Sequence, residues 1–269
     1  MNLRKLIRNN PILYNIRVIQ LRGIRRLQNC HPRVRFARLR NDDALAYPVK
    51  RHQSLLRRKL GDTDPQLQEN KIVNLQLSTA KIDGLLIRPG ETFSFWQAIG
   101  RTTARKGYVE GLLLSHGEVG TGVGGGLCQL ANLLFWMAMH SPLDVVERHH
   151  HSFDAFPDER RVLPFGSGAS VFYNYIDLRF VNRTDATFQL HTWLTDEHLK
   201  GAILCDEDLP LAYHLEERNH RFSQADGTYY RSNEIWRKTV DKRTGNTVNE
   251  ERLIQNHAEV KYPITLSDL

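Results

Sequence analysis

A cysteine two positions after a run of three glycines is the part of this sequence best suited to do chemistry. Residues 122–140 read GVGGGLCQLANLLFWMAMH, and the thiol in this stretch belongs to Cys128. Neither Gly nor Pro occurs in the thirteen residues after Cys128, so a helix is expected from there to about His140. Unpaired N–H groups and the macrodipole at a helix start favour an anion, which lowers the pKa of a thiol. We therefore expect Cys128 to titrate below the ordinary value of about 8.5 and to act as a nucleophile beside an oxyanion hole.

A cysteine nucleophile needs a base, and three adjacent histidines supply candidates. The stretch ERHHHS covers residues 147–152, toward the end of an expected strand. Because side chains alternate along a strand, His149 and His151 would share one face while His150 points away. Asp177, within YIDLRF, is a candidate for the group that orients the histidine. The chain order cysteine, histidine, acid suits a papain-like acyl-transfer site.

Three other interpretations fit the same residues. GTGVGG at 120–125 matches a dinucleotide fingerprint with Glu147 about twenty residues on, although the chain downstream lacks an alternating βαβ pattern. Cys128, His149 and His151 could instead hold zinc, without the spacing of a standard finger. The glycines could also serve only tight packing around a buried thiol. A Walker loop is excluded because the sequence has no Gly-Lys-Ser/Thr.

Several segments together resemble the VanW family. They read RPGETFSFW, KGYVEG, GVGGGLCQLANLLFW, VVERHHHSF and IDLRFVN, and the resemblance runs from about residue 67 to 205, with a family-like β-rich tail. It implies a link to bacterial cell-wall metabolism, and the cysteine-dependent L,D-transpeptidase chemistry associated with exported members that act on peptidoglycan stem peptides. The expected function is therefore a cysteine-dependent acyl transferase or hydrolase of peptidoglycan or its precursors. The alternative is a non-catalytic protein that binds a cell-wall precursor peptide.

The resemblance also implies roles for individual residues. Cys128 is the expected nucleophile, His151 matches the family's recurring histidine, and Asp177 is the third catalytic candidate. The candidate substrate-binding residues are Gly124, Gly125, Gly126, Gln129, Glu147, Arg148 and His149. One departure lies in GSGASV, where Gly168 occupies a position that is often acidic in the family. No cofactor and no metal is expected.

The helices and strands that the sequence predicts around these residues indicate an α+β fold. It comprises a Gly-rich loop and the Cys128 helix packed on a β-sheet, a basic helical N-terminal region and a β-rich C-terminal extension. Further helices are predicted over 11–28 and 65–87, a loop over 106–126, strands over 92–96, 143–153 and 169–182, and hairpins over 188–205 and around 244–246. We divide the chain into an N-terminal region and linker (1–64), a core domain (65–205) and the C-terminal extension (206–269).

The positive charge of the chain is concentrated at its N-terminus. Residues 1–40 hold eleven of the 37 Lys and Arg residues and no Asp or Glu. The rest of the chain therefore holds 26 basic and 30 acidic residues, a net charge of −4. We expect residues 1–40 to contact an anionic membrane surface. Nucleic acid is not expected as a partner, because no known motif or interleaved aromatic residue supports it.

The helix predicted over 11–28 carries Ile12, Ile16, Ile19 and Leu27 on one face. A membrane-surface helix and a helix that simply packs on the body both fit this pattern. The N-terminal segment does not resemble a secretory signal, and the three cysteines are too few and too scattered for a disulfide framework. The expected location is the cytoplasm, peripheral at the inner face of the membrane.

Overall fold

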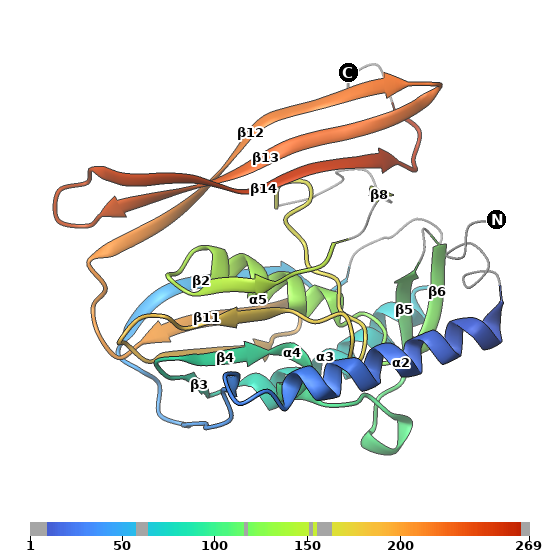
Figure 1. Ribbon diagram of the computed structural model, residues 1–269, viewed down its shortest axis with the longest axis horizontal. Coiled ribbons are helices and arrows are strands. Elements are labelled where there is room, and N and C mark those ends of the chain that lie inside the picture. Colours follow the sequence, from blue (N-terminus) through green and yellow to red (C-terminus); the bar gives the residue numbers. More distant parts are fainter. Residues whose placement is uncertain (1–9, 58–63, 116–117, 151–152, 155–162, 265–269) are drawn as a thin grey trace.

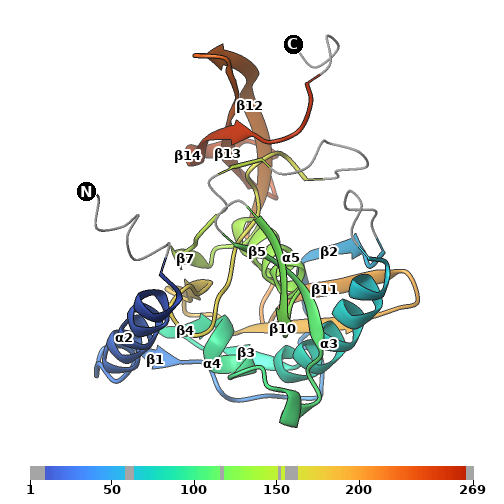
Figure 2. The same cartoon turned by 90° about the vertical axis from the view of Figure 1, so that its right-hand side faces the viewer.

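Within the residues that the structure describes, the fold consists of three four-stranded sheets, a two-stranded hairpin and the helices that pack against them. The computed structural model describes residues 10–57, 64–115, 118–150, 153–154 and 163–264. Helices and two of the sheets form a body, and the long C-terminal strands lie above it (Figure 1, Figure 2). The predicted α+β class with a β-rich C-terminal extension is confirmed.

One sheet of the body has the strand order β2-β11-β10-β3 and is antiparallel throughout. Its members are β2 (Tyr47–Leu55), β3 (Leu85–Ile87), β10 (Phe188–Leu194) and β11 (His198–Cys205). The hairpin predicted over 188–205 is confirmed, and a 2.9 Å hydrogen bond from Thr195 N to His198 O closes its turn. The central helix of the body, α5 (Cys128–Met139), packs against β2 and β11 of this sheet.

The second sheet of the body has the order β1-β4-β9-β7. Its members are β1 (Arg35–Phe36), β4 (Glu91–Ser94), β7 (Asp144–Glu147) and β9 (Arg179–Val181). Phe93 and Phe180 lie opposite each other in β4 and β9, and their rings stack at 4.5 Å between centroids. Both side chains are fully buried, so this pair fixes the centre of the sheet.

The strands of this second sheet are shorter than the sequence predicts. The strand expected over 92–96 ends at Ser94, whose Oγ accepts a 3.2 Å hydrogen bond from Gln97 N and caps α4 (Phe95–Ile99). Among the described residues, the strand expected over 143–153 is represented by β7, which ends at Glu147, and by the start of β8 (Phe153–Asp154), which belongs to a different sheet. The region expected over 169–182 keeps an extended strand only in β9. At the ends of these strands, a helix cap and loop contacts therefore take the place of the inter-strand hydrogen bonds that longer strands would form.

Helix α5 (Cys128–Met139) lies at the centre of the body, with the limits that the sequence predicts. Eight of its twelve residues are buried, the pattern of a helix enclosed on several sides. It packs on β2 and β11 of the first sheet and on β7 of the second. Gly201 in β11 permits this contact, because a Cβ there would lie 2.7 Å from Met137 Cε. The start of α5 is thereby fixed by both sheets.

Helix α3 (Gln66–Ile82) is shorter than the helix predicted over 65–87. It ends before Gly84, which has a φ of 75°, a conformation that favours glycine. The predicted capping residue Asp64 does accept a 2.9 Å hydrogen bond from Gln66 N. The loop predicted over 106–126 contains instead the hairpin of β5 (Glu110–Ser115) and β6 (Glu118–Val123).

A buried asparagine joins α3 to this hairpin and to the glycine loop behind it. The Nδ2 of Asn74 donates to Val109 O at 3.0 Å and to Gly125 O at 2.9 Å, while its Oδ1 accepts from Val109 N at 2.9 Å. Asn74 has no exposed surface. One side chain thus satisfies three backbone groups from two segments, and these bonds fix the loop that precedes α5.

The third sheet has the order β12-β13-β14-β8 and contains the C-terminal strands. Its long members are β12 (Leu211–Ala225), β13 (Thr228–Asp241) and β14 (Thr247–Val260). The hairpin predicted around 244–246 is confirmed by the antiparallel pairing of β13 with β14. The register between β12 and β13 shifts between Arg218 and Arg221, where Asn219 has a φ of 55°.

Helix α2 (Pro11–Asn29) confirms the helix predicted over 11–28 and lies along the body (Figure 1, Figure 2). Arg22 Nε donates to Tyr173 O at 2.7 Å, and Arg179 donates to Asn29 Oδ1 at 2.7 Å. No helix within the described ranges has the length and apolar character needed to cross a bilayer. The cytoplasmic location stays a prediction.

The division into three domains at residues 64/65 and 205/206 stays a prediction. The structure adds that β1 and β2, both before residue 64, pair with strands of the core. Residues 35–36 and 47–55 therefore complete the two sheets of the body.

We predict that Asn74→Ala lowers the free energy of unfolding by about 3 kcal/mol, because it leaves buried backbone groups of Val109 and Gly125 without partners. Urea denaturation measures the change. Asn70→Ala is the matched control: Asn70 lies one turn earlier on α3 and donates to Glu110 O at 2.8 Å, but at a solvent-exposed position. The control should cost less than about 1 kcal/mol, and equal costs would contradict the role of Asn74.

Candidate active site

Cys128 is the first residue of α5 and is half-buried. Leu127 occupies the cap position without a side-chain cap bond. The first-turn N–H of Gln129 bonds to Gly126 O at 3.1 Å, so the glycine loop itself satisfies part of the helix start. The sequence prediction of a thiol at the mouth of a helix is confirmed.

The three glycines before Cys128 allow close contact with the protein's own chain. Gly124 and Gly126 have φ values of 82° and 89°, which favour glycine. A Cβ on Gly125 would lie 2.1 Å from Gly111 O, and one on Gly126 would lie 2.2 Å from Lys71 Cγ. The structural role that the sequence left open is therefore present, while a substrate-binding role for these glycines stays a prediction.

A second segment, residues 164–171, crosses the start of α5. The backbone N–H of Val171 approaches the thiol of Cys128 and acts to lower its pKa. One turn later on the helix, Asn132 Oδ1 accepts a 2.6 Å hydrogen bond from Ala169 N. A Cβ on Gly168 would lie 3.0 Å from the same Asn132 oxygen, so the family's often acidic position faces the helix that carries the thiol.

Burial raises the pKa of the Cys128 thiol, although the N–H groups of Val171 and of Cys128 itself act in the opposite direction. The expectation of a lowered pKa is therefore wrong. The start of α5 supplies the favourable N–H groups, but its surroundings remove water from the sulfur, and desolvation of a thiolate outweighs a few backbone dipoles. Formation of the thiolate consequently needs a proton acceptor.

His149 and His150 do not lie on a strand, because β7 ends at Glu147. The alternation expected for His149, His150 and His151 therefore has no basis in the described part of the chain, and His151 lies outside the described residues. His149 contacts two groups: its backbone O accepts from Ser170 N at 2.8 Å, and its Nε2 lies 3.1 Å from Glu147 Oε1. The first contact joins His149 to the segment that crosses Cys128.

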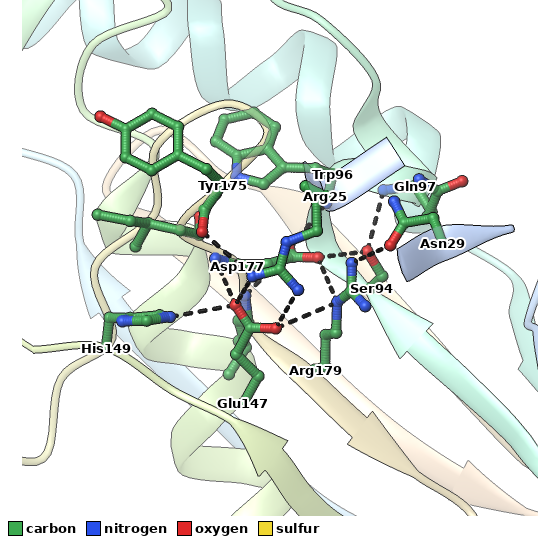
Figure 3. Close-up of polar contacts among 12 residues, drawn as sticks. Arg25, Asn29, Ser94, Trp96, Gln97, Glu147, His149, Tyr175, Asp177 and Arg179 are labelled. Atoms are coloured by element: carbon green, nitrogen blue, oxygen red, sulfur yellow. Dashed lines mark hydrogen bonds and ion pairs between the residues drawn. The ribbon is translucent and has the colours of Figure 1, made fainter. Parts of the chain in front are cut away.

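Glu147 is the centre of a polar network (Figure 3). Arg25 donates to both of its oxygens at 2.7 and 2.6 Å, and Arg179 Nε lies 3.5 Å from Oε2. Burial acts to raise the pKa of Glu147, but the hydrogen bonds and charges of His149, Arg25 and Arg179 hold it below its ordinary value. Glu147 is therefore an ionised acceptor that orients the His149 imidazole.

Asp177, the predicted catalytic acid, is committed to structural contacts. It has no exposed surface, and it accepts hydrogen bonds from Ser94 Oγ at 2.5 Å, Trp96 N at 3.1 Å and Arg179 Nε at 2.8 Å (Figure 3). Burial raises its pKa against the lowering contributions of these partners. The acid that contacts His149 is Glu147, so the orienting role predicted for Asp177 is better placed there.

Two further predicted binding residues hold the site together. The guanidinium of Arg148 donates to Gly168 O at 2.9 Å and to Gly166 O, and lies 5.0 Å from the centre of the Phe135 ring. Burial lowers its pKa to about 10, so it stays charged at neutral pH. The amide of Gln129 donates to Ser54 Oγ at 2.9 Å and Leu55 O at 2.8 Å in β2. A substrate-binding role for either residue stays a prediction.

The alternative interpretations of the sequence fare differently. The dinucleotide interpretation is wrong, because β6 belongs to a two-stranded antiparallel hairpin and not to a parallel βαβ unit. For the zinc interpretation, the described residues contain no cluster of three or more His, Cys, Asp or Glu side chains arranged to hold a metal. One proposed ligand, His151, lies outside those residues.

Asn132, Ser170 and Val171 lie at the site but are not among the residues that the sequence predicts. Asn132 carries a detectable signal, because it is the only polar residue between Leu130 and Met139 and lies one helical turn from Cys128. Ser170 has a buried Oγ without a hydrogen-bond partner among the described residues. Neither Ser170 nor Val171 stands out in the sequence, since their position depends on contacts between distant segments.

Comparisons with known proteins identify chains and a family model that are similar to this one. A family model described as "VanW like protein" matches residues 70–204. The Vancomycin B-type resistance protein VanW of Enterococcus faecalis is 34% identical over 197 residues, which cover 73% of this chain and 72% of that protein. The uncharacterized protein YoaR of Bacillus subtilis is 36% identical over 110 residues, or 41% of this chain and 35% of that protein. No solved structure matches.

We predict that Cys128 reacts slowly with iodoacetamide at pH 7, with half-maximal labelling above about pH 8.5, because burial disfavours the thiolate. The rate is measured against pH in a Cys30→Ser, Cys205→Ser variant, whose remaining cysteine is Cys128. A variant that keeps only the exposed Cys30 serves as the accessible control. Half-maximal labelling of Cys128 below about pH 8.5 would contradict the dominance of burial.

We predict that Glu147→Gln lowers the free energy of unfolding at pH 7 by about 3 kcal/mol, because Arg25 and Arg179 lose their shared counter-charge. Since the pKa of Glu147 is held low, its contribution is present above about pH 4.3 and is lost as the pH falls through the depressed value. The difference from wild type in urea denaturation should therefore shrink as the pH falls below the ordinary glutamate value of about 4.3.

The matched control for Glu147→Gln is Asp144→Asn. Asp144 lies on the same strand and pairs with Arg183 at 2.7 Å, but both side chains are exposed, so the cost should stay below about 1 kcal/mol. A Glu147→Gln penalty that does not change with pH would show that the network does not depend on ionised Glu147.

Proposed function

The chain belongs to the VanW family, and from this membership and the surroundings of its thiol we propose that it is a cysteine-dependent acyl-transfer enzyme acting on peptidoglycan or its precursors. The observation that carries the proposal is the position of Cys128. Its sulfur belongs to the first residue of α5 and is approached by the Val171 N–H, from a segment that Arg148 bonds at Gly168 O. Backbone donors near a sulfur suit the oxyanion of an acyl transfer.

The cell envelope enters the proposal through a relative. The Enterococcus faecalis protein similar to this chain is named for vancomycin resistance, and the family resemblance implies stem peptides of peptidoglycan as the substrate class. Ser170 adds a local argument, because its buried Oγ has no partner among the described residues and it adjoins the Val171 N–H at the thiol. A hydroxyl in this situation is available to a polar group of a bound peptide.

The proposed reaction has two steps. A base takes the proton of Cys128, and the sulfur attacks a peptide carbonyl carbon; the C–S bond forms, the C–N bond breaks, and the amine leaves with the proton returned by the base. An incoming amine or water then attacks the thioester, which restores the thiol. The raised pKa of Cys128 makes the base essential. Within the described residues His149 is the candidate, oriented by Glu147, and His151 stays the family-based candidate.

The raised thiol pKa also favours a second function. A binding protein for a precursor peptide has no need of a reactive thiolate, and a buried neutral thiol suits a pocket wall. The two functions differ in one observable, which is a covalent adduct on Cys128.

We predict that incubation with a peptidoglycan stem peptide gives a mass increase on the intact protein that maps to Cys128, together with cleaved or exchanged product. Cys128→Ala should abolish the adduct and lower turnover by at least about a thousandfold, because no other group supplies the attacking atom. Mass spectrometry of protein and peptide gives both readouts. Cys30→Ser, which removes an exposed thiol at the end of α2, should leave the rate unchanged.

The same assay identifies the base. His149→Ala, His150→Ala and His151→Ala are compared, and the variant that lacks the base should lose about 10²–10⁴-fold in rate. Turnover that survives Cys128→Ala would refute the nucleophile. Tight peptide binding with no adduct and no product in the wild type would establish the binding function instead.

A further inference from the structure

Helix α2 presents an apolar stripe to solvent. The stripe consists of Ile12, Ile16, Ile19 and Leu27, whose exposed fractions are 70%, 57%, 68% and 76%. At 3.6 residues per turn, side chains at these spacings fall along one side of the helix. A helix on the surface of a globular protein normally turns such residues toward the core. Here they point to water.

The opposite side of α2 fixes this orientation. Arg22 bonds to Tyr173 O, and Arg25 bonds to Glu147 and, at 3.1 Å, to Tyr175 O. Asn29 accepts from Arg179 at the end of the helix. Polar contacts therefore attach the second half of the helix to the body, and the apolar stripe cannot turn inward without breaking them. The fold therefore holds the apolar stripe in an exposed position.

The charge of the helix is complementary to an anionic surface. Residues 11–29 contain four Arg and no Asp or Glu, and the first carboxylate of the chain is Asp42. Arg25 is neutralised by Glu147, whereas Arg17 and Arg26 are exposed and form no ion pair with a carboxylate of the described residues. Apolar side chains beside unneutralised arginines are the pattern of a helix that lies in a lipid interface.

We propose that α2 is a membrane-surface anchor, with its stripe inserted among the acyl chains and headgroups of an anionic bilayer and with Arg17 and Arg26 on the lipid phosphates. A second copy of the chain is a poorer occupant, because a symmetric contact through the stripe would bring unpaired arginines together without a carboxylate on the helix to balance them. The proposal goes beyond the acyl-transfer function and does not depend on Cys128.

The anchor also fixes how the protein lies on the membrane. Because α2 is bonded to β7 and β9 through Glu147 and Arg179, it does not act as a flexible tether. The C-terminal sheet lies away from α2 in both views (Figure 1, Figure 2). With the stripe in the bilayer, the bonds to β7 and β9 hold the body in one orientation on the membrane surface.

Co-sedimentation of the full chain with vesicles tests the proposal. Wild type should bind vesicles of equal parts phosphatidylglycerol and phosphatidylcholine, with binding that weakens as salt rises, and should bind phosphatidylcholine alone at least about tenfold more weakly. Ile16→Ser with Ile19→Ser, and separately Arg17→Gln with Arg26→Gln, should each weaken binding to the anionic vesicles about tenfold or more.

The matched control variants remove an apolar side chain or a positive charge from exposed positions outside α2. Val248→Ser takes an exposed apolar side chain from β14, and Arg243→Gln takes an exposed charge from the turn before it; neither should change binding. Thermal unfolding of every variant should match wild type, because the altered side chains contact solvent. Equal binding to neutral vesicles, or unchanged binding of the paired Ile variant, would overturn the proposal. So would a lipid-free dimer in sedimentation velocity that the paired Ile variant dissociates.

Discussion

The removal of two carboxylates from water is the constraint on which this structure depends most. A buried carboxylate is unfavourable unless cations and N–H donors replace its hydration. Asp177 and Glu147 meet this requirement with Arg25 of α2, Arg179 of β9 and backbone N–H groups that include Trp96 N of α4. The N-terminal helix is therefore part of the body. Its polar bonds to the body determine which of its faces is exposed to solvent.

A second constraint is the close packing of the glycine loop that precedes Cys128. The backbones of Gly111 and Gly125 approach so closely that a Cβ on either would overlap the other, and Asn74 closes the contact with hydrogen bonds. This packing positions the start of α5 and also takes water from it. The same local structure thus supplies N–H groups that favour a thiolate and a desolvation that disfavours it, and desolvation is the larger effect.

Features that depend on neighbouring residues could be predicted from the sequence, and features that depend on distant ones could not. The limits of α5 and the hairpin over 188–205 follow from local punctuation by glycine, proline and turn residues. The β5–β6 hairpin was missed because its many glycines are typical of a loop. The partners of Asp177 lie up to 83 residues away, so no spacing shows that its oxygens are occupied. The environment of the thiol could not be predicted for the same reason, since Val171 approaches Cys128 from a separate segment.

The irregular pairing of the C-terminal sheet has a consequence for contacts between molecules. Strand β12 forms one edge of that sheet over fifteen residues, and a flat edge of this length is a template for strands of other chains. The register shift between Arg218 and Arg221, with the left-handed Asn219 inside it, interrupts the row of outward N–H and C=O groups and increases the local twist. An incoming strand can pair with only a few residues before its register is lost. The bulge therefore limits growth of the sheet from one molecule to the next and protects the protein against aggregation through this edge.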